Sequence, residues 1–315
     1  MRKALAATIV IVVAVGLLAQ DRGPSARWDC GMNGVPAHPE IGGELIFNCG
    51  LPSTNTGFYV LDVATGHVRP LIADGVWNTD PAWSPDGTRI AYVSTKDGET
   101  DIYVMDVASA AVNRLTHDPS WNGNPTWSPD GEWIMFDSSR DGTNRSPHNN
   151  FRNLFVVRAD GTELRRVTSA FGYNGAPSWA PSGKLVAFTS DRDGLYHLYT
   201  MNADGSDPRG LAPVGHIARW SPDGARVLFP ATERPTDDPD AVTHVYTMSI
   251  DGRELRQVTD GDDQMPDWTH DGGWIAFARL VGGHRDLFVV STAGGDPIRL
   301  TFDGSSKQWP RWRPR

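Results

Sequence analysis

Histidine and aspartate side chains that could hold a metal ion are scattered through this chain of 315 residues. A divalent cation held by three or four such ligands can activate water or polarise a substrate oxygen. No His-x-His or His-x₃-His pair occurs, so any such site would have to collect its ligands from separate segments. The candidates are His117, His148, His216 and His244, with Asp118 and Asp263. For each histidine, the simpler interpretation is a hydrogen-bonded residue of a loop or strand end.

A second candidate set pairs an aromatic residue with an asparagine, six and five positions before a recurring tryptophan. An aromatic ring supplies rigid contact area, and an amide can hydrogen-bond a peptide or a sugar. The alternative is structural: the asparagine starts a strand through a local turn, and the ring covers a sheet edge. The pairs are Trp77-Asn78, Trp121-Asn122 and Tyr173-Asn174; the equivalent later positions add Asp263 and Lys307, and His216 lies next to the equivalent Gly215.

These residues are positioned by a repeat whose signature is Pro-x-Trp-Ser-Pro-Asp-Gly. Clear copies begin at Pro81 and Pro125, and degraded copies follow. The repeat tryptophans are 44, 52, 41, 48 and 44 residues apart, which is the period of a four-stranded propeller blade. We expect them to pack between blades as structural residues: Trp83, Trp127, Trp179, Trp220, Trp268 and Trp312.

Each repeat reads as four short strands. Ser84-Pro85-Asp86-Gly87 has the residue preferences of a type I turn. Apolar runs such as 89–93 and 101–105 follow, separated by Asp-Gly turns, which is an all-β pattern without helical periodicity. The first repeat lacks its Pro-x-Trp strand, and residues 307–315 supply one with no blade behind it. We therefore predict an all-β, six-bladed β-propeller over 41–315, with four-stranded antiparallel blades and the first blade closed by the C-terminal strand.

The Trp-Ser-Pro-Asp-Gly, Arg-Asp-Gly, Ile-Tyr-Val-Met-Asp and Arg-x-Leu-Thr elements resemble the WD40-like propeller repeat of TolB-type proteins. The resemblance covers residues 43–315. It implies a docking platform in the bacterial cell envelope that binds a protein or cell-wall-associated partner. TolB carries an α/β domain before its propeller; since only residues 20–40 precede the repeats after a leader, we expect the propeller without that domain.

The N-terminus indicates export. Arg2 and Lys3 precede an apolar run from Ala4 to Ala19, so residues 1–19 read as a cleaved signal peptide or, alternatively, an uncleaved membrane anchor. Residues 20–40 read as a tether. Cys30 and Cys49, the two cysteines, could form a disulfide in an oxidising compartment, or they could remain two buried thiols. We expect a periplasmic or extracellular protein.

Net charge indicates which class of partner the protein does not suit, and loop placement indicates the face on which a partner would bind. The formal charge is −9, without a basic run, which does not suit nucleic-acid binding. Strand order places the uniform Ser-Pro-Asp-Gly turns on one face of the disc and the irregular loops, including 143–152 and 233–242, on the other. We expect the partner on the irregular face.

The sequence thus favours a non-enzymatic monomeric scaffold with no cofactor and no metal. A propeller-associated serine hydrolase is excluded because no Gly-x-Ser-x-Gly motif occurs and the repeats leave no room for its catalytic domain. The alternative that stays open is a metal-dependent carbohydrate lyase or lactone hydrolase with its ion in the central channel.

Overall fold

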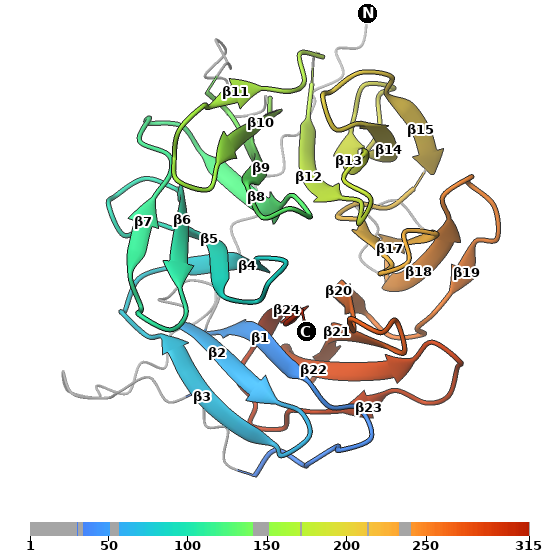
Figure 1. The fold of residues 1–315 in the computed structure, drawn as a ribbon. Helices are drawn as coiled ribbons and strands as arrows, with labels where there is room; N and C mark the ends of the chain where they lie inside the picture. Colours follow the sequence, from blue (N-terminus) through green and yellow to red (C-terminus); the bar gives the residue numbers. More distant parts are fainter. Residues whose placement is uncertain are drawn as a thin grey trace, which may run out of the picture.

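The computed structural model describes residues 30, 34–50, 57–140, 151–170, 172–212, 214–232 and 241–314. Within these ranges, 24 strands form six four-stranded antiparallel sheets. The sheets are arranged like blades around one axis, as Figure 1 shows. The predicted all-β, six-bladed propeller is therefore confirmed.

Each blade runs from an inner strand beside the axis to an outer strand at the rim. We number the blades in chain order from the one that contains β1. Their strands, from inner to outer, are as follows: blade 1, β24 (Lys307–Trp312), β1 (Glu44–Cys49), β2 (Gly57–Asp62) and β3 (His67–Ile72); blade 2, β4 (Asn78–Trp83), β5 (Arg89–Ser94), β6 (Asp101–Asp106) and β7 (Val112–Arg114); blade 3, β8 (Asn122–Trp127), β9 (Trp133–Ser138), β10 (Asn153–Arg158) and β11 (Arg165–Arg166); blade 4, β12 (Asn174–Trp179), β13 (Leu185–Ser190), β14 (His197–Asn202) and β15 (Arg209–Ala212); blade 5, β16 (Arg219–Trp220), β17 (Arg226–Thr232), β18 (Thr243–Ser249) and β19 (Arg256–Gln257); blade 6, β20 (Asp263–Trp268), β21 (Trp274–Val281), β22 (His284–Ser291) and β23 (Ile298–Arg299).

The ring is closed by the two ends of the chain. The C-terminal β24 pairs antiparallel with β1, with Trp312 opposite Leu45 and Lys307 opposite Cys49. The predicted closure of the first blade is thus confirmed, and it removes two open strand edges that would otherwise invite association. In addition, the indole N–H of Trp83 in blade 2 donates to the carbonyl of Arg311 in blade 1, at 3.3 Å.

The Ser-Pro-Asp-Gly segments form the turns between inner and second strands. Gly87 N–H donates to Ser84 C=O at 2.8 Å, and Gly87 has a φ of 66°, a conformation that glycine adopts without strain. The Asp86 carboxylate accepts from the Ser84 hydroxyl and from the Thr88 N–H. These hydrogen bonds lower the pKa of Asp86 to about 2. The short, satisfied turns make this side of the disc uniform.

In blades 2, 3, 5 and 6, a buried threonine hydroxyl holds the outer part of the blade. In blade 2, Thr116 donates to the carboxylate of Asp101 at 2.6 Å and accepts from the Ile102 N–H at 3.0 Å, while Arg114 pairs with the same carboxylate. Blade 6 repeats this arrangement with Asp286 and Thr301. The Arg-x-Leu-Thr element therefore serves to anchor the start of the third strand.

The core lies between neighbouring blades. Trp83 packs with Ile46 and Phe58 of blade 1 and with Ile90 of its own blade. The other repeat tryptophans also pack against clusters that join two blades. Burial of about 150–250 Å² per indole, at ~25 cal/mol per Å², makes each a major contributor to the ring.

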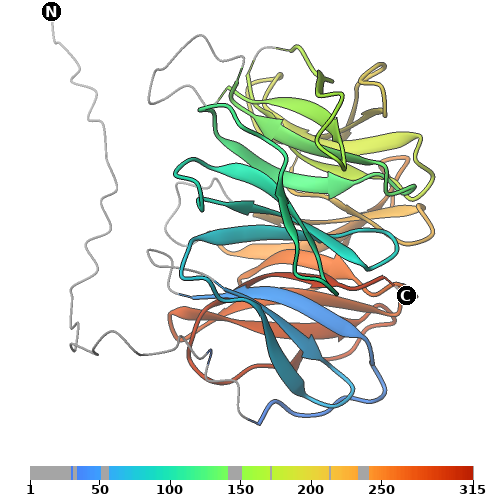
Figure 2. The ribbon, with the colours of Figure 1, turned by 60° about the vertical axis from the view of Figure 1, so that its left-hand side comes forward.

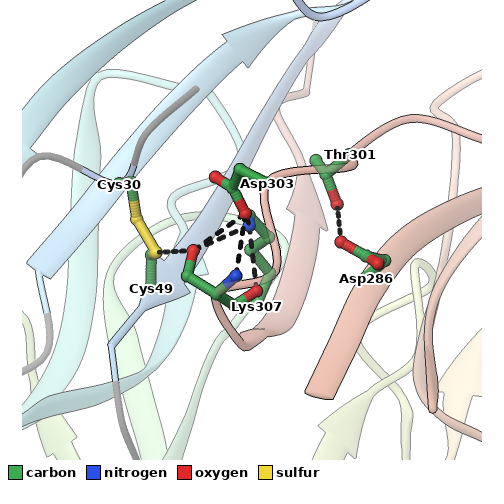
Figure 3. Close-up of a disulfide and its surroundings, with 7 residues drawn as sticks. Cys30, Cys49, Asp286, Thr301, Asp303 and Lys307 are labelled. Atoms are coloured by element: carbon green, nitrogen blue, oxygen red, sulfur yellow. Dashed lines mark hydrogen bonds and ion pairs between the residues drawn. A yellow bond between two sulfur atoms is a disulfide. The ribbon is translucent and has the colours of Figure 1, made fainter. Parts of the chain in front are cut away.

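A disulfide joins the N-terminal segment to blade 1 (Figure 3). Cys30 and Cys49 are bonded, and Cys49 Sγ lies 3.4 Å from the Ser305 hydroxyl, next to the buried Lys307. The predicted leader at 1–19 and the tether residues 20–29 and 31–33 lie outside the described residues. In the described part of the chain, no helix has the length and apolar character needed to cross a membrane.

Two faces follow from this topology. We call the side with the Ser-Pro-Asp-Gly turns and the C-terminus the turn face, and the opposite side the loop face. Figure 2 shows the disc obliquely from its side, with the C-terminus at the right-hand edge. Of the long insertions expected on the loop face, 143–152 and 233–242, residues 143–150 and 233–240 lie outside the described residues.

Candidate functional site

The six inner strands surround a central channel and share one distortion. The residue at the third position of the Asn-x-x-Pro-x-Trp template has a positive φ of 49–58° in each of them. In the five inner strands of blades 1, 2, 3, 4 and 6, the pairing register shifts at this point, as in a β-bulge. The residues concerned are Asp80, Asn124, Ala176, Ile217, Met265 and Trp309. We call the end where the inner strands begin the loop mouth, and the end at the repeat tryptophans the turn mouth.

At the loop mouth, an arginine lies between two of the predicted aromatic residues. The guanidinium of Arg152 is 3.4 Å from the ring centroid of Trp121 and 5.5 Å from that of Tyr173. Its Nη1 pairs with Asp137 Oδ2 at 3.1 Å, and Asp137 is fully buried. The Arg152 side chain remains 21% exposed. The ion pair with Asp137 therefore holds the stack in place, and the exposed part of Arg152 leaves it accessible at the loop mouth.

Glycines in the inner strands make room for these two rings. A Cβ at Gly123 would lie 2.0 Å from Trp121 Cη2, and a Cβ at Gly175 would lie 2.5 Å from Tyr173 Cζ. Each ring therefore folds back over its own strand. Blade 2 has Thr79 at the same position, and there Trp77 packs instead against the core cluster that joins blades 2 and 3. The three predicted aromatic residues thus do not act alike: two reach the Arg152 stack.

The three predicted asparagines are fully buried and are hydrogen-bonded within the protein. Asn122 Nδ2 donates to the carbonyls of Ser120 and Thr100, and its Oδ1 accepts from Arg140. Asn174 is used in the same way, and Asn78 donates to Asp74 and Val76. This is the local strand-starting role that the sequence left as an alternative. Because Trp77 packs against the core, only the rings of Trp121 and Tyr173 remain for a partner.

The later positions of the predicted set also have internal partners. Asp263 is fully buried and accepts from Arg279 through both oxygens, at 2.7 and 2.8 Å. Lys307 is fully buried and donates to Asp303 and to the Ser305 carbonyl. His216 is partly buried, and burial lowers its pKa. Contacts of these three residues with a partner stay a prediction.

Two carboxyl groups in and beside the channel resist ionisation. Burial raises the pKa of Asp137, and Arg152 opposes this shift. Burial also raises the pKa of Asp80 to about 6, against the attraction of Arg311. The channel therefore holds carboxyl groups whose charge depends on neighbouring arginines.

The turn mouth contains a cavity of about 380 Å³ that residues of all six inner strands line. The residue just before each repeat tryptophan faces this cavity. Three consecutive blades contribute small side chains, Ala82, Thr126 and Ser178, and the other three contribute Arg219, Asp267 and Arg311. Burial, with repulsion from Arg311, lowers the pKa of Arg219 to about 9. The described turn face thus has a pocket where sequence reasoning expected only uniform turns.

The candidate metal ligands do not converge among the described residues. His117 is exposed, and His244 Nδ1 lies 2.9 Å from the Gly261 carbonyl. His148 lies outside the described residues. Within the described ranges, no group of three or more His, Cys, Asp or Glu side chains has an arrangement that could hold a metal ion.

Sequence reasoning missed four arginine and aspartate residues of the channel: Arg152, Asp137, Arg219 and Arg311. A signal for two of them was present. Aligning the repeats on their tryptophans puts Arg219 and Arg311 in the position just before Trp, where blades 2, 3 and 4 have small residues. Arg152, at the end of the long insertion, carries no such signal.

The fold and the channel define a closed six-bladed propeller whose inner strands surround a channel lined by polar side chains. A model of the TolB beta propeller domain matches residues 42–147 and 145–234. The Tol-Pal system protein TolB of Bordetella pertussis is 32% identical over 236 residues, 74% of this chain and 51% of that protein. The chain belongs to the TolB β-propeller family, and it spans about half the length of this relative.

Solved structures agree on the fold. TolB from Acinetobacter baumannii superimposes with a TM-score of 0.74 at 23% identity, covering 90% of this chain and 69% of that one. An oligogalacturonate lyase from Vibrio parahaemolyticus gives a TM-score of 0.54 at 13% identity, covering 79% and 76%. At these identities, the likeness shows the architecture alone.

Proposed function

We propose that this protein is an exported, non-enzymatic docking platform that binds a protein or cell-wall-associated partner of the cell envelope at its loop mouth. The observation that carries the proposal is the stack of Trp121, Arg152 and Tyr173. Aromatic and arginine side chains dominate the binding energy of many protein interfaces. Because Asp137 fixes Arg152, the stack is ordered before a partner arrives, so little side-chain entropy is lost on binding.

Export is part of the same proposal. The Cys30–Cys49 disulfide is stable in an oxidising compartment such as the periplasm. The apolar N-terminal run and the relatives named as Tol-Pal system proteins support the same location. The partner is then a component of the envelope or of the extracellular space.

The test is capture of envelope proteins by the immobilised chain and by Trp121→Ala and Tyr173→Ala variants. Asn122 is left unchanged, since its buried hydrogen bonds support the fold. Leu255→Ala is the matched control, because Leu255 is an exposed apolar residue that lines a pocket with the blade 5 turn residue Asp223, away from the loop mouth. We expect at least one envelope protein that the parent and the control retain equally and that both aromatic variants retain at least tenfold less.

Near-ultraviolet circular dichroism of each variant checks that the fold is intact. Equal retention of every captured protein by the parent and the two aromatic variants would remove the loop mouth as the docking site.

A further inference from the structure

The turn-mouth cavity has two unlike halves. Ala82, Thr126 and Ser178, from blades 2, 3 and 4, leave space on one side. Arg219 and Arg311, from blades 5 and 1, approach from the other side. Six identical side chains at the position before each repeat tryptophan would either all fill the channel or all leave it open. Here the small half leaves room directly opposite the two guanidinium groups.

In the described part of the chain, these two guanidinium groups have no direct ion-pair partner, although the more distant carboxyl groups of Asp267 and Asp80 attract both. Among the described residues, no carboxylate oxygen lies within 4.0 Å of Arg219 or Arg311, whereas Arg152, Arg279 and Arg313 each pair with one. Within the described ranges, Arg219 and Arg311 donate hydrogen bonds to backbone carbonyls only. Buried arginines normally meet a carboxylate or a phosphate, because burying an unpaired charge is costly.

Two nitrogen donors in the cavity wall also lack acceptors. Arg219 Nε and Trp312 Nε1 are buried and have no hydrogen-bond partner among the described residues. Trp312 is only 6% exposed. Four other repeat indoles donate to the neighbouring blade, for example Trp127 to the Ala82 carbonyl at 3.0 Å. Buried donors without acceptors are uncommon in native structures and point to a missing partner.

The cavity is positive although the chain is acidic. Arg219 and Arg311 line it with one carboxylate, Asp267, while Arg313, which also lines it, is paired with Glu44, in a chain of net charge −9. Asp267 is already engaged, since its Oδ2 accepts from the Trp312 backbone N–H at 2.8 Å. Charge of one sign in a recess with low-dielectric walls attracts a ligand of the opposite sign.

We propose that the turn-mouth pocket binds a carboxylate at the end of a slender chain, with Arg219 and Arg311 as its charged donors. Guanidinium groups match the planar geometry of a carboxylate. The small residues opposite leave a path for the rest of the ligand, and the surrounding repeat tryptophans and prolines supply apolar contact. The end of a peptide and a small organic acid both present this group. The site is separate from the loop mouth, so its failure would leave the docking proposal standing.

Calorimetric titration of the whole protein at neutral pH and low salt tests the site with three probes: trialanine, trialanine amide and glutarate. We expect trialanine or glutarate to bind, trialanine amide to bind at least tenfold more weakly than trialanine, and affinity to fall as salt is raised. Preference for trialanine assigns a peptide end, and preference for glutarate assigns an organic acid.

Arg219→Met should weaken binding of the preferred probe at least tenfold, whereas Arg209→Met, an exposed arginine paired with Asp207, should leave it unchanged. A second measurement needs no arginine variant. The NMR resonance of the Trp312 indole N–H, assigned by comparison with Trp312→Phe, should shift when the probe is added to the unmodified protein. No heat with either acid, equal binding of the amide, or an unmoved Trp312 resonance would overturn the proposal.

Discussion

The two mouths of the channel use arginine in opposite ways. At the loop mouth, Arg152 has a carboxylate at 3.1 Å and an aromatic ring at 3.4 Å, so its charge is matched inside the protein. At the turn mouth, Arg219 has neither among the described residues, and its Nε is buried without an acceptor. The difference shows that an arginine paired with a carboxylate is held in place for contact with a partner, whereas an arginine without such a pair can bind a negatively charged ligand.

The largest effect is expected from breaking the matched pair. Arg152→Met leaves the fully buried Asp137 without its cation, so we expect a loss of about 3–5 kcal/mol in the free energy of unfolding at neutral pH. The loss should be smaller at pH 5, because protonation of Asp137 removes the buried charge. Urea denaturation at both pH values measures this, with Arg209→Met as the control. A loss below about 1 kcal/mol at neutral pH would mean that Arg152 does not stabilise Asp137.

A carboxyl group inside the channel should give a pH-dependent effect. The pKa of Asp80 is raised from 3.8 to about 6, so the folded state binds its proton more tightly than the unfolded chain does. The associated stability is present below pH 3.8 and is lost as pH rises through about 6. Asp80→Asn should therefore be more stable than the parent at pH 7.5, by at most about 3 kcal/mol.

That gain should shrink steadily as pH is lowered from 7.5 to 4. The pH dependence isolates the charge, because asparagine also tolerates the positive φ of this position and blade 3 has Asn124 there. A gain that stays constant from pH 4 to pH 7.5 would assign the effect to the backbone and not to ionisation.

Removing Arg219 should change the free energy of unfolding in the opposite direction to removing Arg152, which is paired with Asp137. Arg219→Met takes a guanidinium without a carboxylate partner out of the cavity wall, so we expect unchanged or increased stability, by about 1–2 kcal/mol. Thermal unfolding beside Arg152→Met makes the comparison direct. A destabilisation of Arg219→Met as large as that of Arg152→Met would show that the two mouths do not differ in this way.

The smallest expected effect is the difference in stability between losing an indole that donates a hydrogen bond and losing one that does not. Trp83→Phe removes the hydrogen bond to the Arg311 carbonyl and leaves that buried carbonyl with one acceptor site unused, at a cost of about 1 kcal/mol beyond the lost contact area. Trp312→Phe removes a donor that has no partner, so this extra cost is absent. Chemical denaturation of the two variants should show the difference, and equal losses would contradict it.

The sequence was sufficient to predict the fold because each repeat carries its own turn and strand signals. Ser84 to Gly87 specify a tight turn by local hydrogen bonds, and the six tryptophans at near-equal spacing count the blades. The closure by β24 could be predicted too, since the first repeat lacked a strand that the C-terminus supplied. Each of these features depends on a few neighbouring residues or on counting repeats, so it can be predicted from the sequence alone.

The candidate site could be predicted only in part. Trp121 and Tyr173 were found because they occupy equivalent positions in successive repeats. Asn122 was also found, but whether its amide faces a partner or the protein depends on neighbours in another blade. Arg152 was missed because it ends an irregular insertion outside the repeat pattern, and its contacts with Trp121 and Asp137 exist only once the blades are side by side.

From its residues alone, this chain determined a six-bladed ring, since turn chemistry and strand alternation act over a few positions. Only the tertiary structure decided which charges meet across the axis. The side chains of Arg152 and Asp137 come together, and those of Arg219 and Arg311 have no carboxylate within ion-pair distance among the described residues, because electrostatic pairing depends on distances between blades that the repeat pattern does not encode.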